Sequence, residues 1–263
     1  MDSDMNINNE VYDEMANHWW DDSEFGTMAT ILYFANSPRF NYFSSILENK
    51  FNFDYSKDCL MDIGCGGGYL AEEFAKIGFN VTGVEPSIES IKAAVKHASA
   101  NNLQIKYVNG YGENLPFESN SFSIITCCDV FEHVKNLNAV ISEISRILVP
   151  GGILFFDTIN RTITSKILLK ITQDWKSTSF MEPNVHVWDM FIKPKELFKI
   201  FKIHGLKNIE IKGISPGINM FSAYIYLRKC KKKEISIKEL ATLLDIRIDN
   251  NTQNSYIGYA IKQ

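Results

Sequence analysis

The chain of 263 residues has few cysteines, no long apolar run and no large excess of either charge. Its five cysteines include no C-x-x-C pair of the zinc-binding kind, so we expect a reduced, intracellular chain. No apolar run reaches the roughly 18 residues of a membrane-spanning helix, and the acidic N-terminus lacks the apolar core of a signal peptide. A formal net charge of −4 argues against a dedicated nucleic-acid-binding protein.

The apolar content is sufficient for a sizeable core. Hydrophobic residues make up 45% of the chain, which favours one large domain over two. Residues 1–57 are rich in aromatic and polar side chains and show patterns of short helices, whereas residues 58–263 alternate short apolar runs with longer helical patterns. We therefore expect an N-terminal helical lid or substrate segment over 1–57 and an α/β domain over 58–263.

The alternation from residue 58 onwards predicts a parallel sheet with helices on both faces, because parallel neighbours require crossover connections. The expected strands are 59–63, 80–84, 104–108, 122–127 and 153–156, followed by antiparallel extensions near 206–212 and 221–228 and a terminal strand at 255–261. The expected helices are 69–77, 87–101, 137–148, 162–173, 194–203 and one within 236–246.

A glycine cluster at 64–68 joins the first of these strands to the next helix. Glycine lets the backbone turn sharply and approach a ligand at the start of a helix. Glu85 ends the second strand, where a carboxylate can accept both hydroxyls of a ribose. Nicotinamide and S-adenosylmethionine binders share this geometry, but Tyr69 stands where the nicotinamide fingerprint G-x-G-x-x-G requires its third glycine. No Gly-Lys-Ser/Thr follows, which excludes a P-loop.

Four motifs in order resemble the donor site of the Rossmann-like S-adenosylmethionine methyltransferases. They are D-I-G-C-G-G-G at 62–68, V-E-P at 84–86, G-Y-G-E-N-L-P-F at 110–117 and L-x-P-G-G at 148–152. The resemblance implies a seven-stranded sheet and S-adenosylmethionine as the methyl donor. It implies methyl-donor contacts from Arg39, Asp62, Gly64, Cys65, Gly66, Glu85, Pro86, Gly112, Glu113, Cys128 and Asp129. The alternative is a glycine turn that serves packing alone.

Individual roles follow from the same resemblance. Asp62 is expected to orient the glycine loop and Glu85 to hold the ribose. Tyr111 occupies a position that is usually acidic in the family, which puts an adenine contact from that side chain in doubt. Cys65 and Cys128 are expected to be small buried side chains rather than nucleophiles.

A longer resemblance, over about residues 10–215, is to the O-methyltransferases of ubiquinone biosynthesis. The matching stretches are W-W-D at 19–21, E-F at 24–25, N-x-P-R at 36–39, C-C-D-V-F-E-H-V at 127–134, T-I-N-R-T at 158–162 and F-I-K-P-x-E-L at 191–197. This resemblance implies O-methylation of a catechol- or quinol-like small molecule that bears an isoprenoid tail.

The chain also departs from this family. The spacing before Asn36 is stretched and about 228–250 is longer than the family needs, so we expect acceptor-pocket insertions at about 158–205 and 228–250. N- or C-methylation of a specialised metabolite remains the alternative, since acceptor pockets vary on one fold. A non-catalytic donor-binding protein is a further alternative.

Asp129, Glu132 and His133 are spaced i, i+3 and i+4. If a helix begins here, their side chains share one face and suit a hard metal ion or an acid–base cluster. The family resemblance supports a Mg²⁺-type ion held by all three residues, with His133 and Glu132 as catalytic groups. In the metal-free alternative, Asp129 contacts the methyl donor and His133 alone is the base. His186 is a second histidine that could face the acceptor.

Aromatic residues suggest a lid over the methyl donor. Trp19, Trp20 and Phe25 are expected in this lid, and Arg39 is expected to clamp the carboxylate of the methyl donor. Ordinary packing of the tryptophans onto the sheet is the alternative.

A basic surface suggests a second kind of contact. The helix at 162–173, with Lys166 and Lys170, and the basic run 228–233 could contact an anionic membrane. We favour a core-facing helix and a solvated loop, because the net charge gives no general attraction to anionic lipid. The expected location is the cytoplasm, with peripheral membrane contact as an addition, and the expected partner is a small-molecule acceptor.

Overall fold

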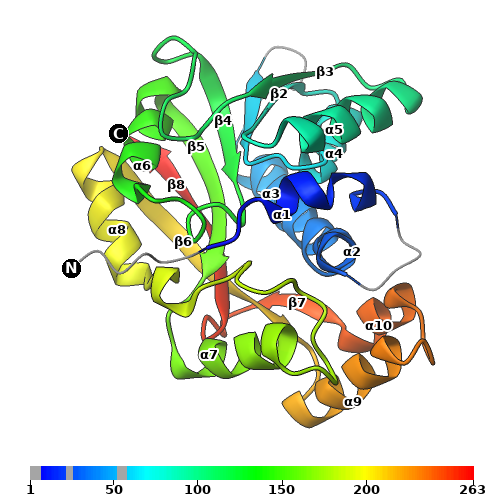
Figure 1. The fold of residues 1–263 in the computed structure, drawn as a ribbon. Coiled ribbons are helices and arrows are strands. Elements are labelled where there is room, and N and C mark those ends of the chain that lie inside the picture. Colours follow the sequence, from blue (N-terminus) through cyan, green and yellow to red (C-terminus); the bar gives the residue numbers. More distant parts are fainter. Residues whose placement is uncertain (1–6, 22–25, 52–57) are drawn as a thin grey trace.

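The computed structural model describes residues 7–21, 26–51 and 58–263. Its centre is an eight-stranded sheet of order β3-β2-β1-β4-β5-β8-β6-β7, so the predicted α/β fold is confirmed, with eight strands where the family resemblance implies seven (Figure 1). The five neighbouring strands β3, β2, β1, β4 and β5 are parallel, and the pairs β5–β8, β8–β6 and β6–β7 are antiparallel. The strands are β1 Cys59–Ile63, β2 Asn80–Glu85, β3 Ile105–Asn109, β4 Phe122–Cys127, β5 Leu148–Ile159, β6 Leu206–Pro216, β7 Ile246–Asp249 and β8 Ser255–Lys262.

Helices precede the sheet and connect its strands. The α-helices are α1 Val11–Glu14, α2 Thr27–Thr30, α3 Ser37–Lys50, α4 Tyr69–Lys76, α5 Ile88–Ala100, α6 Leu137–Ile147, α7 Ile163–Leu169, α8 Pro194–Ile203, α9 Met220–Lys231 and α10 Ile237–Leu244. Short 3₁₀ segments are η1 Ala16–His18 and η4 Trp188–Met190, and π-helical segments are η2 Ile31–Asn36 and η3 Lys170–Asp174. None of the described helices is both long and apolar enough to cross a membrane.

Two apolar clusters cover the two faces of the sheet. Helices α6 and α8 pack on the face that carries Met61 and Ile125, and α3 and α4 pack on the face that carries Leu60 and Ile124. Neighbouring residues of one strand therefore point to opposite sides, as the pleat requires. Because both faces are covered, the central strands are apolar throughout, which is why they appeared as continuous apolar runs in the sequence.

One predicted strand is wrong. Residues 221–228 belong to helix α9, which begins after Asn219, whose side chain accepts a hydrogen bond from a first-turn amide. The buried residues Ala223, Leu227 and Cys230 are four and three positions apart, which is the spacing of one helical face. The additional strand of the sheet is β7, which pairs with the end of β6.

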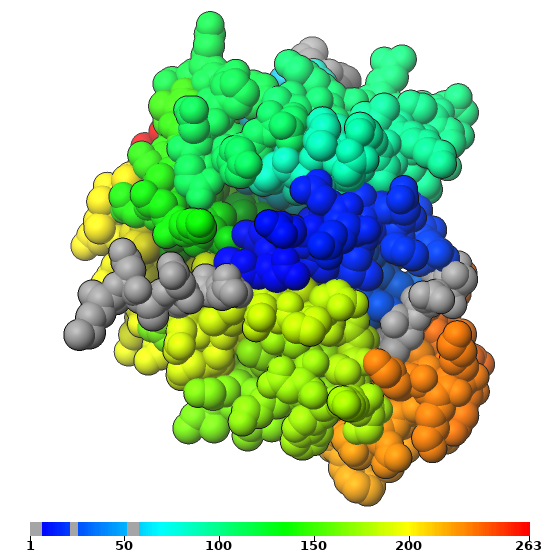
Figure 2. All heavy atoms as spheres, in the orientation of Figure 1, coloured from blue at the N-terminus to red at the C-terminus, as the bar shows by residue number. Residues whose placement is uncertain are grey.

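The N-terminal residues lie across the edge of the sheet at which the parallel strands end. The amide of Asn8 donates to the carbonyl of Asn184 at 2.9 Å, and the carbonyl of Tyr12 accepts from a serine at the start of α5. Figure 2 shows this segment (blue) between the green-cyan half of the molecule and the yellow-green segment that follows β5. Glu24 and Phe25 lie outside the described residues.

Candidate active site

A cavity of about 500 Å³ opens at the carboxyl ends of β1, β2 and β4. All the residues predicted to contact the methyl donor line it: Arg39, Asp62, Gly64, Cys65, Gly66, Glu85, Pro86, Gly112, Glu113, Cys128 and Asp129. Ligands of doubly wound sheets bind at this edge, because the loops there leave the strands on one side. We call this space the donor cavity.

The glycine loop at the floor of the donor cavity has a backbone that few other residues tolerate. Gly64, Gly66 and Gly68 have φ angles of 72°, 50° and 90°. The Glu85 carboxylate braces the loop, since it accepts from the amide of Gly66 at 3.1 Å and from the amide of Ser87 at 3.0 Å. Burial raises the pKa of Glu85 to about 7, and these two amide bonds oppose the shift.

Two tryptophans of the N-terminal segment cover the same loop. A Cβ atom on Gly66 would lie 2.5 Å from the Trp19 ring, so the absence of a side chain there makes room for the cover. The indole nitrogen of Trp20 donates to the carbonyl of Gly67 at 2.9 Å. The rings of Trp19 and Trp20 each pack nearly perpendicular to the ring of Tyr69, with centroids 5.2 and 4.6 Å from its centroid. Tyr69, which stands where the nicotinamide fingerprint has its third glycine, therefore packs against these two tryptophans.

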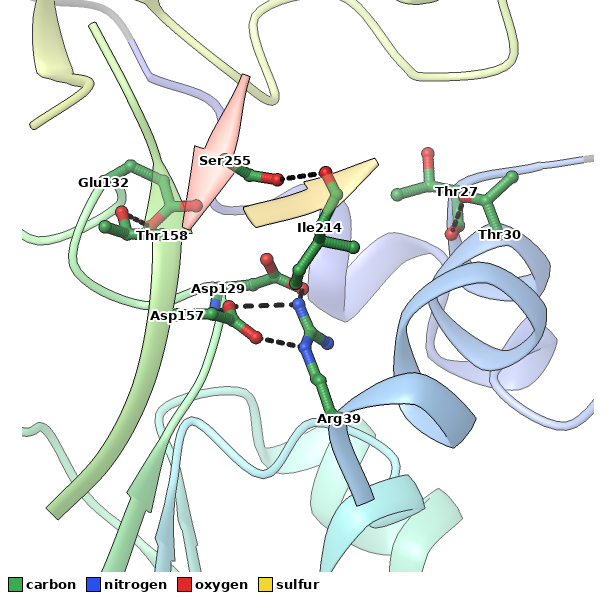
Figure 3. A network of polar contacts seen from close by, with 9 residues as sticks. All are labelled: Thr27, Thr30, Arg39, Asp129, Glu132, Asp157, Thr158, Ile214 and Ser255. Atoms are coloured by element: carbon green, nitrogen blue, oxygen red, sulfur yellow. Dashed lines mark hydrogen bonds and ion pairs between the residues drawn. The ribbon is translucent and has the colours of Figure 1, made fainter. Parts of the chain in front are cut away.

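Arg39 is buried and joins two carboxylates at the end of the donor cavity (Figure 3). Its Nε and Nη2 donate to both oxygens of Asp157, and Nη2 also donates to Asp129. Burial is the largest single influence on Asp129 and raises its pKa, but the charge and hydrogen bond of Arg39, together with His186 and His133, outweigh it, and the net shift of the pKa is downward. For Asp157 burial outweighs Arg39 and raises the pKa to about 6. The guanidinium is thus held in place by the protein itself.

The stretch that contains Asp129 is not a helix, which corrects the prediction of three side chains on one helical face. Asp129 has a left-handed φ of 52°, the following residues form a turn, and α6 starts only at Leu137. Asp129 therefore turns towards Arg39. The groups that come together are Glu132, His133 and His186, whose ligand atoms all lie within 4.8 Å of one another.

Two members of this three-residue cluster carry polar atoms without a partner among the described residues. They are Oε1 of Glu132 and Nε2 of His133, and both are buried. Glu132 accepts a hydrogen bond from Thr158 at 2.7 Å through its other oxygen, and His133 contacts Asn9 through Nδ1 at 3.3 Å. Burial raises the pKa of Glu132 to about 8 and lowers those of His133 and His186 to about 3 and about 4.

A second cavity of about 290 Å³ lies beside the donor cavity and is mainly apolar. We call it the acceptor cavity. Its wall includes Ile31, Phe34, Leu168, Leu169, Ile171, Phe180, Met181, Met220, Ala223, Leu227, Leu244 and Ile246. Tyr12, Ile31, Arg39 and Asp129 line both cavities, so the two spaces meet at these residues.

Comparison with known proteins agrees with this geometry. A family model described as a methyltransferase domain matches residues 61–156. The ubiquinone biosynthesis O-methyltransferase of Colwellia psychrerythraea is 31% identical over 220 residues, which cover 80% of this chain and 87% of that protein. The one from Actinobacillus pleuropneumoniae serotype 7 is 34% identical over 207 residues, covering 77% and 85%. The chain belongs to the family of ubiquinone biosynthesis O-methyltransferases.

The methyltransferase also resembles solved structures in its fold. Magnesium protoporphyrin IX methyltransferase from Synechocystis PCC 6803, solved with bound S-adenosylhomocysteine, superposes with a TM-score of 0.63 at 15% identity. The match covers 97% of this chain and 95% of that one. Family and fold together make the protein an S-adenosylmethionine-dependent O-methyltransferase.

The magnesium ion that the family resemblance implied does not fit this cluster of the methyltransferase. Mg²⁺ prefers oxygen ligands in an octahedral arrangement. The Asp129 carboxylate is engaged by Arg39, which leaves one carboxylate, that of Glu132, with the two imidazoles of His133 and His186.

Several residues of the methyltransferase site were not found in the sequence. Asp157 follows the apolar run 153–156, and an acidic residue at the end of a buried strand was the signal that could have revealed it. Thr158 begins the stretch T-I-N-R-T, which indicates the family but no role for this residue, and Asn9 belongs to no motif. Tyr12 is half-buried, lines both cavities and lies with its ring centroid 5.8 Å from that of His133. Nothing in the local sequence distinguishes it from an ordinary core tyrosine.

Proposed function

We propose that this methyltransferase methylates a phenolic hydroxyl of a catechol- or quinol-like ring that carries an apolar chain. The observation that carries the proposal is the junction of the two cavities. The acceptor cavity suits an apolar chain, and it meets the donor cavity at Arg39 and Asp129. A ring whose chain fills the acceptor cavity would present its hydroxyl group beside the methyl donor.

The methyl donor is held by the residues of the donor cavity. Glu85 ionises to accept the ribose hydroxyls, and the glycine loop lies against the methionine part. The bonds of Arg39 to Asp129 and Asp157 use Nε and Nη2, so Nη1 is the nitrogen that can reach the carboxylate of the methyl donor. Trp19 covers the loop and excludes water from this end of the cavity.

The transfer itself requires alignment and the loss of one proton. The acceptor oxygen attacks the methyl carbon in line with the sulfonium. The carbon–sulfur bond breaks, its electron pair stays on sulfur, and S-adenosylhomocysteine leaves as product. Because the methyl group is already bonded to a cationic sulfur, correct orientation and exclusion of water provide most of the rate increase.

The proton of the acceptor hydroxyl passes to the pair formed by Glu132 and His133. His133 lines the donor cavity and carries the unpartnered Nε2. Glu132 is more deeply buried, and with its pKa raised to about 8 it acts as a base in its ionised fraction, which is far more basic than an exposed carboxylate. His133, with its lowered pKa, relays the proton and the carboxyl group retains it.

A panel of matched acceptors tests this function. We expect S-adenosylhomocysteine release and a methylated product, identified by mass spectrometry, with a catechol that bears a prenyl chain. The bare catechol should react with a higher KM, and the fully O-methylated ring should not react. A ring with an amino group in place of the hydroxyl distinguishes N-methylation. If only the amine is methylated, the O-methylation of a phenol is the wrong assignment.

Two helices that line the acceptor cavity, α7 and α9, also carry exposed apolar side chains. Ile163 and Ile167 on α7 and Phe221 on α9 are exposed, with Ile163 and Phe221 at 77% and 74%. The apolar side of α7 is therefore exposed at Ile163 and Ile167, so the prediction of a core-facing helix is wrong at these positions. Lys166 lies on α7, and the basic run 228–233 forms the end of α9 and the two residues after it.

We propose that this surface contacts an anionic bilayer, from which a chain-bearing acceptor could enter the acceptor cavity. Co-sedimentation with vesicles that contain anionic lipid should decrease when Ile163 and Phe221 are both replaced by serine. Replacement of the exposed Val95 on α5 by serine is the matched control. Equal binding by all three proteins, or no binding to any vesicle, would contradict this contact and leave the acceptor assignment untouched.

A further inference from the structure

We propose that His97 on α5 is a positioning residue for the methyl donor, because its charged imidazole holds Trp20 against the glycine loop. We call Trp19 and Trp20, which lie over this loop, the tryptophan cover. The inference goes beyond the proposed function, since it concerns retention of the methyl donor whichever acceptor is methylated. His97 is not among the described residues that line the donor cavity, so it acts through Trp20 and is not a catalytic residue.

Both tryptophans of the cover are held on one face of α5. Figure 1 shows the N-terminal segment (dark blue) beside this helix. The indole nitrogen of Trp19 donates to Oγ of Ser90 at 2.8 Å. The Trp20 ring lies flat on the imidazole of His97, with ring centroids 3.4 Å apart and an angle of 4° between the planes. Ser90 and His97 are two helical turns apart, so their side chains share one face of α5.

A buried carboxylate on α4 fixes the other side of the His97 ring. Nδ1 of His97 lies 2.7 Å from Oε1 of Glu72, whose side chain is completely buried. The second oxygen, Oε2 of Glu72, has no hydrogen-bond partner among the described residues. A buried carboxylate is costly unless a positive charge accompanies it, and a separation of 2.7 Å is typical of charge-assisted N–H···O bonds. We therefore assign the charged form to the imidazole and the ionised form to Glu72.

The geometry of the stack indicates the same charge. Neutral aromatic rings prefer offset or edge-to-face packing, as Trp20 shows against Tyr69 with an angle of 85° between the planes. The Trp20 and His97 rings are instead almost directly superposed. A cation is attracted to the face of an indole ring, which explains this arrangement. Both contacts of the imidazole, with Trp20 and with Glu72, therefore depend on its charge.

Other charged groups on the elements packed around His97 contact each other, namely Lys76 with Glu73 on α4 at 2.8 Å and His18 with Asp21 in the N-terminal segment at 3.7 Å. Tyr107 on β3 is neutral, because burial is the main cause that raises the pKa of its hydroxyl group. Burial also raises the pKa of Glu72, and the hydrogen bond from His97 opposes that shift. Glu72 is thus the charged group that faces the His97 ring.

The stack is linked to the donor cavity through the glycine loop. The indole nitrogen of Trp20 donates to the carbonyl of Gly67 at 2.9 Å. Trp19, the other half of the cover, lies so close to the loop that a Cβ atom on Gly66 or Gly67 would be 2.5 or 2.4 Å from its ring. Without the charged imidazole, Trp20 loses its support and the cover opens more readily. A bound methyl donor should then dissociate faster, although no residue that touches it has changed.

Calorimetry with S-adenosylhomocysteine at neutral pH tests this role. We expect His97→Gln to bind about tenfold more weakly than the wild type, as for the loss of one cation–aromatic contact. His97→Arg, whose planar cation can stack on Trp20 and bind Glu72, should stay within about threefold of the wild type. His18→Gln, which removes an exposed imidazole from the N-terminal segment, is the matched control. Wild-type affinity in His97→Gln, or an equal loss in His97→Arg or in His18→Gln, would overturn the proposal.

A second set of variants shows whether His97 acts through Trp20. In a Trp20→Ala background, His97→Gln should weaken the binding of S-adenosylhomocysteine by less than about twofold, because the contact between the two rings is already absent. A full tenfold loss in that background would contradict action through Trp20.

Tryptophan fluorescence gives an independent readout, because a charged imidazole in contact with an indole quenches its emission. The emission of Trp20 is obtained by subtracting the spectrum of the matching Trp20→Phe variant. It should increase in His97→Gln and remain unchanged in His18→Gln. Equal emission of Trp20 in the wild type and in His97→Gln would overturn the charged stack.

A further variant separates positioning from folding. His97→Gln leaves the buried carboxylate of Glu72 without its cation, which lowers the stability of the fold. The double variant Glu72→Gln/His97→Gln removes both charges and keeps two side chains that can hydrogen-bond to each other. Circular dichroism should show that it is folded, while its affinity for S-adenosylhomocysteine stays about tenfold below that of the wild type.

Normal affinity in the folded double variant would overturn the role of the imidazole charge. All these measurements use S-adenosylhomocysteine and no acceptor. A negative result therefore leaves the methylation of a phenol untouched, and failure to methylate any phenol leaves the role of His97 untouched.

Discussion

The donor cavity and the acceptor cavity of this methyltransferase are built in different ways. The floor of the donor cavity comes from loops that directly follow β1, β2 and β4, within a stretch that starts at Asp62 and ends at Asp129. The acceptor cavity is formed by segments that are distant in sequence, from η2 through α7 to α9 and β7. The donor cavity depends on a local motif, whereas the acceptor cavity depends on the packing of distant segments. Substitutions can therefore change the lining of the acceptor cavity while the donor cavity stays the same.

Arg39 is one of the residues that connect the two cavities. Arg39 comes from α3, outside the motif stretch, yet its guanidinium binds Asp129 and Asp157 at the ends of two sheet segments. It lines both cavities. Substitutions of Arg39, of one residue in each cavity, and of Glu85 therefore test this difference between the two cavities.

The largest effect is expected from Arg39→Ala. Removal of the guanidinium leaves two buried carboxylates without their partner, and the free energy of unfolding should fall by about 3–5 kcal/mol. Urea denaturation measures this change. Lys92→Ala, which breaks the exposed pair of Lys92 with Glu89, should change stability by less than about 1 kcal/mol. If both variants lose the same small amount of unfolding free energy, the ion pairs of Arg39 with Asp129 and Asp157 do not stabilise the fold.

The next effect concerns the cover of the donor cavity. A Cβ atom on Gly67 would lie 2.6 Å from the Cβ of Trp19, so Gly67→Ala should displace the N-terminal cover. Overpacking of this kind costs about 1–3 kcal/mol, and we expect S-adenosylhomocysteine to bind about 5- to 150-fold more weakly by calorimetry. Gly26→Ala, where the added atom meets nothing within 4 Å, should bind normally. Normal binding by Gly67→Ala would mean that Trp19 does not matter for the donor cavity.

In the acceptor cavity the effect should be smaller and selective. Ala223→Leu fills part of the apolar wall, and the KM of a chain-bearing catechol should rise about tenfold, as for the exclusion of roughly two methylene groups. The KM of the bare catechol and the affinity for S-adenosylhomocysteine should not change. Ala100→Leu on the surface of α5 is the control. A rise in KM for both acceptors alike would show that the chain does not occupy this cavity.

The smallest effect is a pH dependence at Glu85. Burial raises its pKa in the folded protein to about 7, above the ordinary value of 4.5. The folded state therefore holds this proton more tightly than the unfolded state, and the stabilisation is lost as the pH rises through about 7. Between about pH 5 and pH 8 the Tm of the wild type should fall by a few degrees relative to Glu85→Gln. Parallel curves would show that Glu85 is not perturbed.

The affinity for the methyl donor should change in the opposite direction. Only the ionised carboxylate accepts two ribose hydroxyls, so binding should strengthen with pH in the wild type and remain flat in Glu85→Gln. Calorimetry at several pH values measures both. Weakening of the wild-type affinity with rising pH would contradict the ribose contact.

The sequence predicted the parallel half of the fold well. Strands 59–63 and 122–127 and helix 194–203 have the predicted bounds, and the donor-cavity residues lie together as expected. These features depend on the local apolar period, on caps and on glycine, all of which can be read from neighbouring residues. The motif residues converge because parallel strands end at one edge of a sheet.

Two predictions failed where local patterns were ambiguous. Residues 221–228 are apolar at nearly every position, so a strand and a helix were both compatible with the run, and packing of its Ala223 and Leu227 side selected the helix. The spacing of Asp129, Glu132 and His133 was compatible with a helical face. The left-handed backbone at Asp129 and its bond to Arg39 prevented that arrangement.

The sequence by itself determined the strand–helix order and the glycine loop with its carboxylate at Glu85, because each depends on residues that are neighbours along the chain. The tertiary structure alone decided that Tyr12 and Arg39 line both cavities and that His186 of the acceptor cavity lies beside His133 of the donor cavity, with ring centroids 5.0 Å apart. Their proximity results from packing the N-terminal segment and the segment after β5 against the same edge of the sheet. No local period or spacing encodes a contact between such distant parts of a chain.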